Sequence, residues 1–240
     1  MDHTERTVML IGEEGAEKLR RSRVAVFGIG GVGGYVTEAL ARAGVGELDL
    51  IDNDTVSLSN INRQIIALHS TTGRYKTETA AARIADISPE CRVRTYNILY
   101  LPETADMFDF SAYDYVVDAI DNVTGKLTLI ERARDAKVPV ISSMGTGNKL
   151  HPELLELADI YDTSVCPLAR VMRYECRKRG IDRLKVVYSK EKPLTPHSQP
   201  TDTKKPVPGS ISFVPGAAGL IIAGEVVRSL IGSAVPTAER

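Results

Sequence analysis

A short apolar segment followed by a group of glycines constrains the fold of this chain more than any other feature. Residues 24–27 form an apolar run that includes two β-branched valines, which is typical of a buried parallel strand. Gly28, Gly30 and Gly33 then form G-x-G-x-x-G, and a helical pattern covers residues 35–43. Glycine permits the sharp turn, the close approach of backbone to phosphate oxygens and the tight packing of helix on strand. The segment predicts a nucleotide site, because free N–H groups and the helix dipole hold anions, but it does not distinguish NAD, FAD and ATP.

Strand and helix patterns alternate along the first 147 residues. Strand patterns occur at 24–27, 48–51, 92–98, 115–120 and 139–142, and helical patterns between them cover 35–43, 74–87 and 123–136. Such alternation is typical of βαβ units with right-handed crossovers on a parallel sheet. We therefore predict a Rossmann-like, doubly wound α/β fold with a mainly parallel sheet. A separate helical arm at residues 8–20 is expected to lead into the first strand.

The pattern changes beyond residue 147. We predict a strand joining the sheet in antiparallel direction, a helix, a further strand and a closing helix, at 154–160, 166–179, 184–188 and 216–230. Residues 190–209 carry five prolines among polar residues and are expected to form a mobile loop. The chain is thus divided into a nucleotide-binding domain at 1–147 and an antiparallel C-terminal extension of the same domain at 148–240, which would bind the substrate.

Composition excludes several classes of protein. With 240 residues, 43% of them hydrophobic, the chain can bury one good core. Its three cysteines, Cys91, Cys166 and Cys176, lack C-x-x-C spacing, so neither a four-thiolate zinc site nor a disulfide framework is expected. The apolar stretch at 216–232 is interrupted by Glu225 and Arg228, which favours a buried helix over a membrane span. Because the N-terminus has no apolar signal segment, we expect a cytoplasmic protein.

One segment departs from the nearly neutral charge of the chain. The formal net charge is −1, yet residues 170–192, here called the basic segment, contain nine Lys or Arg and only three Asp or Glu. The usual explanation of such a run is a solvated helix face. A face that binds a polyanion is the alternative.

Polar loops follow four of the predicted strands, at 28–34, 52–63, 118–122 and 143–147. Because the carboxyl ends of parallel strands lie at one edge of the sheet, these loops are expected to converge on one crevice, where ligands of such folds bind. Asp52 ends the second strand, nineteen residues after Gly33, and is expected to bind ribose hydroxyls. Capping of a turn is the alternative role.

Two cations and a carboxylate favour ATP over NAD. Arg63 and Lys76 follow the ribose-binding acid, and a triphosphate requires cations on its outer phosphates. Asp121 is placed to hold Mg²⁺. Each of these residues alone would more often form a surface ion pair. Their grouping at one edge of the sheet makes ATP the better prediction.

As a set, these motifs resemble the adenylation domain of the ubiquitin-activating-enzyme superfamily, the fold shared with ThiF and MoeB. The similar segments are 28–33, 51–64, Lys76 and 118–122. The resemblance implies ATP and Mg²⁺ as cofactors, with Asp52 on the ribose and Asp121 on the metal. The residues implied to bind the nucleotide are Gly28, Gly30, Gly31, Gly33, Asp52, Asp54, Asn60, Arg63, Gln64, Lys76, Asp121 and Asn122.

The same resemblance implies four catalytic residues, Arg6, Arg63, Lys76 and Asp121. Asn60, Arg63 and Lys76 would contact the phosphates. Arg6 matches an arginine that reaches into the partner subunit's site in this superfamily, which implies a homodimer.

Segments of the second half resemble one branch of the superfamily, the tRNA threonylcarbamoyladenosine dehydratases. They are residues 142–149, 158–160, 167–173 and 213–220. The resemblance implies ATP-dependent adenylation of the threonyl carboxylate on the modified adenosine, followed by closure of the side chain into a cyclic form. The basic segment would then contact tRNA phosphates. A monovalent cation, Na⁺ or K⁺, and a cysteine desulfurase as sulfur-relay partner are left open.

Two other functions compete with this one. An adenylating enzyme for the C-terminal glycine of a ubiquitin-like sulfur-carrier protein is the first, although the cysteine count forbids the zinc tetrad that many such enzymes have. An NAD-linked oxidoreductase or a nucleotide-sensing protein is the second, and it leaves Arg63, Lys76 and Asp121 unexplained. Cys166, before Pro167 at a predicted helix start, would suit an acyl thioester, but a buried apolar role is commoner for such a cysteine.

Overall fold

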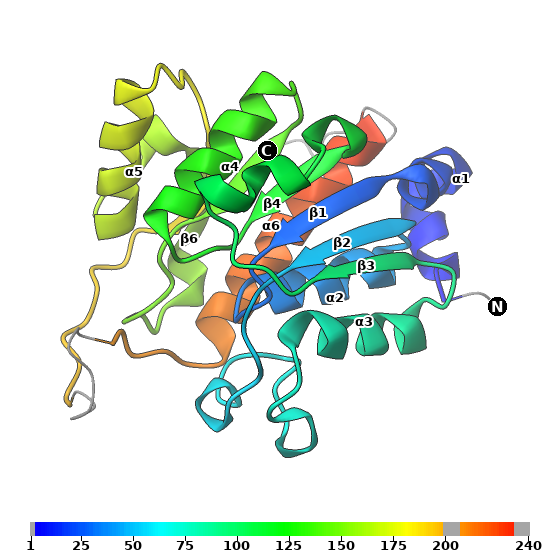
Figure 1. The fold of residues 1–240 in the computed structure, drawn as a ribbon, viewed down its shortest axis with the longest axis horizontal. Coiled ribbons are helices and arrows are strands. Elements are labelled where there is room, and N and C mark those ends of the chain that lie inside the picture. The colour runs from blue at the N-terminus through cyan, green and yellow to red at the C-terminus, as the bar shows by residue number, and fades with distance from the viewer. Residues whose placement is uncertain (1–2, 199–206, 233–240) are drawn as a thin grey trace.

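The computed structural model describes residues 3–198 and 207–232, which form one seven-stranded sheet with helices on both of its faces (Figure 1). The strands are β1 (Arg23–Phe27), β2 (Glu47–Ile51), β3 (Arg92–Tyr96), β4 (Tyr115–Asp118), β5 (Val140–Ser143), β6 (Leu155–Asp159) and β7 (Lys185–Ser189). The α-helices are α1 (Glu5–Arg21), α2 (Gly33–Ala43), α3 (Lys76–Ile87), α4 (Val123–Asp135), α5 (Pro167–Lys178) and α6 (Phe213–Ile231).

The strand order is β3-β2-β1-β4-β5-β7-β6, and every pairing is parallel except that of β6 with β7. The chain winds outward from β1 to β3 and then returns to the other side of β1 to form β4 and β5. This reversal between β1 and β4 is the switch point at which ligands of doubly wound sheets bind. The predicted Rossmann-like fold and its antiparallel C-terminal strand are confirmed.

Alternating residues of the central strands build separate cores on the two faces of the sheet. Val24 and Val26 point to a core formed with α1, α2, α3 and α6. Ala25 and Phe27 point to the other face, where the Phe27 ring packs against aromatic side chains of the segment before β4. A third group of buried side chains lies between α4, α5 and β7. A strand that is buried on both faces explains why its sequence is a continuous apolar run.

The two terminal helices belong to the main core. Half of the apolar stretch of α6 is buried, and this helix packs against α1 and α2, as a core helix does. α1 buries Ile11 and Leu19 in the same core, so the separate arm expected at residues 8–20 is instead part of the domain. At Gly12 the backbone leaves the helical conformation (φ 71°), which kinks α1.

Several predicted elements end where pairing or a turn stops them. β3 ends at Tyr96, two residues before the predicted end, because Tyr96 is opposite Ile51, the last residue of β2. β4 ends at Asp118 because its carboxylate accepts a hydrogen bond from the backbone N–H of Ile120 and turns the chain. The expected loop at 190–209 has no helix or strand in its described parts, and residues 199–206 of it lie outside the described residues.

Candidate functional site

The glycine loop between β1 and α2 leaves no room for side chains at two of its positions. Gly28 has φ +90°, and a Cβ atom there would lie 2.6 Å from the carbonyl oxygen of Ala119, just after β4. A Cβ atom on Gly33 would lie 1.7 Å from the carbonyl oxygen of Gly28. The loop is therefore held tightly against the carboxyl end of β4, with the N-terminus of α2 at the switch point. This is the setting in which a helix N-terminus binds phosphate.

Asp52 joins the end of β2 to this loop. One carboxylate oxygen accepts the N–H of Ile29 at 2.7 Å, and the other accepts the N–H of Asp54 at 2.8 Å. Burial raises the pKa of Asp52, although nearby Lys76 and the two backbone N–H groups oppose that rise. A carboxylate has about four acceptor positions, so Asp52 keeps capacity for further hydrogen bonds, such as those from ribose hydroxyls.

Lys76, the first residue of α3, is buried beside Asp52. Its Nζ donates to Asp54 at 2.6 Å and lies 3.9 Å from Asp52 Oδ1. The side chain is thus fixed at the carboxyl edge of the sheet by two carboxylates. The two carboxylates therefore hold the positive charge of Lys76 in one position at this edge of the sheet.

The loop between β2 and α3 (residues 52–75), here called the crossover loop, brings two further predicted residues close to the glycines. Gln64 is buried beside Gly30, and its Oε1 atom has no hydrogen-bond partner, which is rare for a buried polar atom. Arg63 passes close to Gly31 and donates from Nη1 to the carbonyl of Ser59 and to Oδ1 of Asn62, without a carboxylate partner among the described residues. Arg63 can therefore donate hydrogen bonds to an anionic ligand at the glycine loop, and Gln64 Oε1 can accept one from a hydroxyl or amino group of the ligand.

Three further predicted residues lie on loops at the same edge of the sheet but differ in the hydrogen bonds that their side chains already form. Asp121 is exposed and has no hydrogen bond or ion pair within the described chain. Asn122 caps α4, since its Oδ1 accepts the N–H of Gly125 at 3.0 Å. Asn60 similarly accepts the N–H of Ser57 at 3.1 Å. The two asparagines thus have local structural roles, and their side-chain N–H groups remain for a ligand.

Arg6 is not part of this group. It lies in α1, two residues after Thr4, which contacts Gly44 just before β2. That contact places the start of α1 at the amino edge of the sheet, opposite the glycine loop (Figure 1). Arg6 is exposed there and cannot reach the glycine loop of its own subunit.

A buried ion pair that the sequence analysis missed lies beneath the site. Lys126 of α4 donates from Nζ to Asp118 at 3.0 Å and to the carbonyl of Ser143 at 2.8 Å, and Asp118 also accepts the hydroxyl of Ser142. Lys126 occupies the same helical stripe as Leu127 and Ile130, which are buried apolar residues. A charge within an apolar stripe is the signal by which this residue could have been found.

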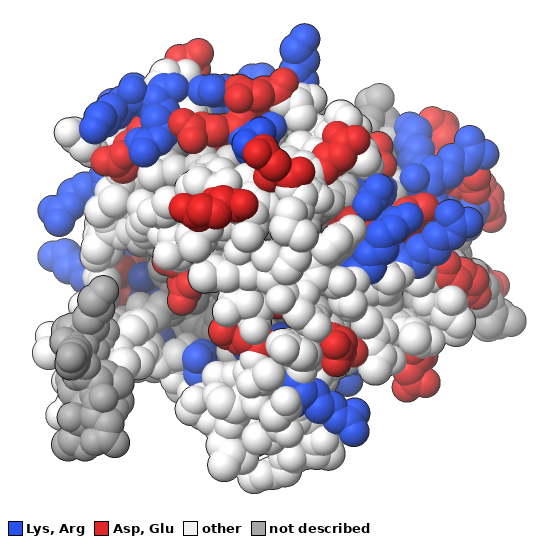
Figure 2. Space-filling view, viewed as in Figure 1, with Lys and Arg blue, Asp and Glu red and all other residues white. Residues whose placement is uncertain are grey.

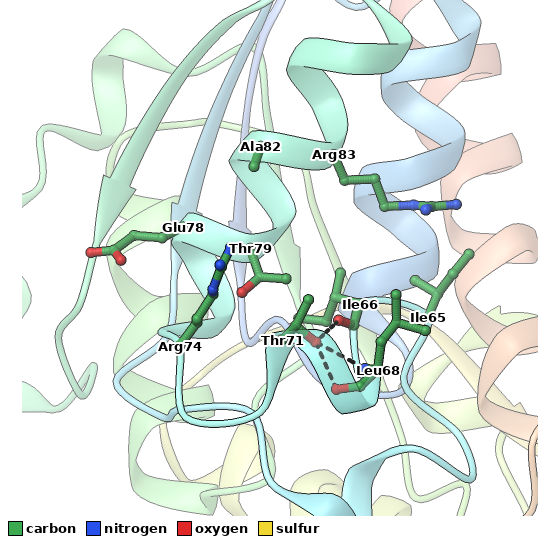
Figure 3. A pocket seen from close by; sticks show the side chains of 9 residues that line it. All are labelled: Ile65, Ile66, Leu68, Thr71, Arg74, Glu78, Thr79, Ala82 and Arg83. Atoms are coloured by element: carbon green, nitrogen blue, oxygen red, sulfur yellow. Dashed lines mark hydrogen bonds between the residues drawn. The ribbon is translucent and has the colours of Figure 1, made fainter.

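A pocket lies apart from these residues. It has a volume of about 490 Å³ and lies between the crossover loop and α3 (Figure 3). Its lining residues are Ile65, Ile66, Leu68, Thr71, Arg74, Glu78, Thr79, Ala82 and Arg83. The Thr71 hydroxyl, which donates to Ile66 and Leu68 and accepts the N–H of Leu68, shapes this side of the loop. None of the predicted nucleotide-binding residues lines this pocket.

The basic segment has charges that the chain does not neutralise. Figure 2 shows Lys and Arg side chains gathered over α5, which forms the first part of the segment. Three of its cations, Arg179, Lys185 and Lys190, have carboxylate partners. Within the described residues, the other six cations have none, namely Arg170, Arg173, Arg177, Lys178, Arg183 and Lys192. Most Lys and Arg side chains in the rest of the described chain have a carboxylate partner, so the unpaired positive charge of the described residues is concentrated in this segment.

Comparison with known proteins identifies this arrangement. A model of the ThiF family matches residues 4–240. The chain belongs to the ThiF family. The resemblance inferred from the glycine loop, the Asp52–Gln64 segment and Lys76 is therefore confirmed.

Among the ThiF-family relatives, the tRNA threonylcarbamoyladenosine dehydratase of Bacillus subtilis is 42% identical over 240 residues, which cover 94% of this chain and 93% of that protein. A crystal structure of the Escherichia coli tRNA N6-threonylcarbamoyladenosine dehydratase in complex with AMP superposes with a TM-score of 0.88 at 32% identity, covering 95% of this chain and 94% of that one. The molybdopterin-synthase adenylyltransferase of Salmonella typhimurium is 40% identical, but over 54% of this chain and 51% of that protein.

Proposed function

We propose that the protein is an ATP-dependent tRNA threonylcarbamoyladenosine dehydratase. It would adenylate the threonyl carboxylate of the modified adenosine in tRNA, and the activated side chain would then close into a cyclic form. The similarity to the Bacillus subtilis dehydratase along almost the whole of both chains carries this proposal. A tRNA substrate also agrees with the expected cytoplasmic location.

The site residues fit ATP. The glycine loop and the N-terminus of α2 would hold the phosphates, and Asp52 would accept the ribose hydroxyls. The unsatisfied Oε1 of Gln64 supports a polar ligand at this loop, because a buried amide oxygen without a partner costs free energy. Arg63 and Lys76 would neutralise the phosphates, with Asn60 donating its free N–H groups.

Asp121 fits a magnesium ion carried by the nucleotide. Mg²⁺ is commonly bound by one or two carboxylates together with substrate phosphates, so a single free carboxylate at the crevice suffices. The described residues contain no group of three or more His, Cys, Asp or Glu that could hold a metal without the nucleotide. When bound, Mg²⁺ would neutralise the charge that develops on the phosphates. A monovalent cation stays a prediction.

The chain's own residues account for the first reaction step. A carboxylate is a poor electrophile, and transfer of AMP to it gives a mixed anhydride with a good leaving group. Arg63 and Lys76 would stabilise the charge that builds on the leaving pyrophosphate, because fixed cations in a partly enclosed site act more strongly than in water. A nucleophile on the same substrate would then attack at high effective concentration. No acyl-enzyme is needed, which agrees with Cys166 being buried.

We propose a homodimer in which Arg6 acts on the partner's nucleotide. The position of Arg6 at the amino edge supports this arrangement only in trans, since the glycine loop of its own subunit is at the opposite edge. The exposed side chains of Met9 and Leu10 on the same helix offer an apolar surface for such contact. A sulfur-relay partner stays a prediction.

An adenylating enzyme for a ubiquitin-like sulfur carrier is the second candidate. The molybdopterin-synthase adenylyltransferase aligns with 54% of this chain, whereas the Bacillus subtilis dehydratase aligns with 94% of it. Incubation with ATP and tRNA bearing threonylcarbamoyladenosine, followed by mass spectrometry of the nucleosides, distinguishes the two. Conversion to the cyclic form supports the proposal, and an unchanged nucleoside contradicts it.

A further inference from the structure

Lys149 is a buried lysine that is not among the nucleotide-binding residues. It is 3% exposed, and its Nζ donates to the carbonyl oxygen of Gly145 at 2.7 Å. No carboxylate of the described residues lies within 4.0 Å of this amine. A protonated lysine has three N–H donors, so the protein leaves most of its hydrogen-bonding capacity unused.

Two other lysines that are buried in the described part of the chain differ from Lys149 in this respect. Lys76 is paired with Asp54, and Lys126 is paired with Asp118. Burial lowers the pKa of Lys149, and the two ionisable groups that face it, Cys166 at the start of α5 and Glu191 after β7, only oppose that change. A buried lysine without a hydrogen-bonded carboxylate favours the free amine, which is a base.

The loop that carries Lys149 is fastened to the phosphate side of the site. The backbone N–H of Asn148 donates to Gly209 at 2.8 Å, and the Asn148 side chain accepts from the N–H of Gly209 at 2.6 Å. Asn62 donates to the carbonyl of the next residue, Ser210, and accepts from Arg63. Lys149 is thus held at the same sheet edge as Arg63, one strand beyond β4 and Asp121.

Closure of the activated side chain releases a proton, so it requires a group that can accept one. This inference rests on the proposed function, in which the closing step forms a bond between a ureido atom of the substrate and the acyl carbon of the same substrate. The bond from that carbon to the AMP oxygen breaks, AMP leaves with the electron pair, and one ureido N–H proton is released. Arg63 cannot accept that proton, because a guanidinium is not deprotonated in proteins.

We propose that the free amine of Lys149 accepts the proton released when the activated side chain closes. This role separates Lys149 from the residues of the first step. Its loss is expected to affect closure and to leave adenylation intact.

The test compares two half-reactions in Lys149→Met and Lys149→Arg. Arginine can keep the hydrogen bond to Gly145 but cannot act as a base, so it separates a chemical role from a structural one. Lys137→Met is the matched control, because Lys137 is exposed just before β5 at the opposite edge of the sheet. ATP–pyrophosphate exchange with modified tRNA measures adenylation, and single-turnover formation of the cyclic nucleoside measures closure, both across a series of pH values.

We expect both Lys149 variants to retain exchange and to lose closure by about 100-fold or more, as is common when a general base is removed. In the unsubstituted protein and in Lys137→Met, the closure rate should rise with pH as the amine loses its proton, and this rise should be absent from the variants. Closure at the normal rate in Lys149→Arg, an unchanged pH profile, or equal loss of both half-reactions would overturn the proposal. Absence of exchange in the unsubstituted protein would instead count against the proposed function.

Discussion

Lys126 and Asp118 form an ion pair, 3.0 Å between Nζ and Oδ2, in which neither side chain has any exposed surface. The same amine donates to Ser143, so the pair joins the carboxyl ends of β4 and β5. The second oxygen of Asp118 fixes the turn that leads to Asp121. The floor of the candidate site is therefore built on a charge pair that has no contact with water.

Replacement of one member of this pair should destabilise the fold strongly. Lys126→Met leaves an unpaired carboxylate in the core, which is expected to cost about 3–5 kcal/mol of the free energy of unfolding. Asp118→Asn combined with Lys126→Met should cost less than the sum of the single changes. Denaturant unfolding measures these values. Arg132→Met is the control, because Arg132 lies on the same helix as Lys126 but forms an exposed pair with Asp106, so the free energy of unfolding should change little. If the effects of Asp118→Asn and Lys126→Met simply add in the double variant, the account is contradicted.

The glycine loop should respond differently at two neighbouring positions. Gly33→Ala places a Cβ atom 1.7 Å from the Gly28 carbonyl, so the loop must move and thermal stability should fall. Gly30→Ala meets nothing closer than 3.9 Å, so the protein should fold normally, but the added methyl group should weaken ATP binding at the phosphates. Thermal unfolding and calorimetric titration with ATP separate the two effects. Unaltered ATP affinity in Gly30→Ala would show that the nucleotide does not approach this backbone.

Arg63→Ala and Asp121→Ala should each reduce ATP–pyrophosphate exchange by about 100-fold or more, as loss of a charge-stabilising group does in other enzymes. Asp121 is exposed, and Arg63 bonds only to its own loop, so thermal stability should be unchanged. Arg74→Ala, in the neighbouring pocket, is the control. Exchange at the normal rate in either variant would remove that residue from the site.

Arg6 and Asp121 should complement each other across a dimer. Arg6→Ala and Asp121→Ala should each be inactive alone. Mixed dimers of the two variants contain one site with both residues intact if Arg6 acts in trans, so part of the activity should return. Mixing after mild dissociation, with exchange as the readout, tests this. Persistent inactivity of a proven mixed dimer would exclude a trans-acting Arg6.

The basic segment should bind tRNA through phosphate contacts. Arg170→Ala with Lys178→Ala removes two unpaired cations from α5, so affinity should fall and the slope of log K against log salt should decrease by about 1–2 units. Affinity for ATP should be unaffected. Arg21→Ala, on α1 with an 80% exposed side chain, is the matched control. An unchanged salt slope would show that this face of α5 does not contact tRNA phosphates and is an ordinary solvated surface.

The order of the elements could be predicted because most residues of the central strands are apolar and glycine or polar loops separate these strands from helices. The convergence of Asp52, Arg63 and Lys76 could also be predicted, since parallel strands place their carboxyl ends at one edge. The pairing of Lys126 with Asp118 could not, because the burial of a lysine depends on how α4 packs on β4 and β5. The burial of Lys149 could not be predicted for the same reason, and its lack of a carboxylate partner in the described chain depends on how its loop folds.

The central claim is that the crevice adenylates a carboxylate on tRNA, and ATP–pyrophosphate exchange measures it most directly. We predict exchange that requires Mg²⁺ and tRNA bearing threonylcarbamoyladenosine, and that is absent with tRNA lacking the modification. Exchange that ignores the tRNA and instead requires a small carrier protein with a C-terminal glycine would contradict the account.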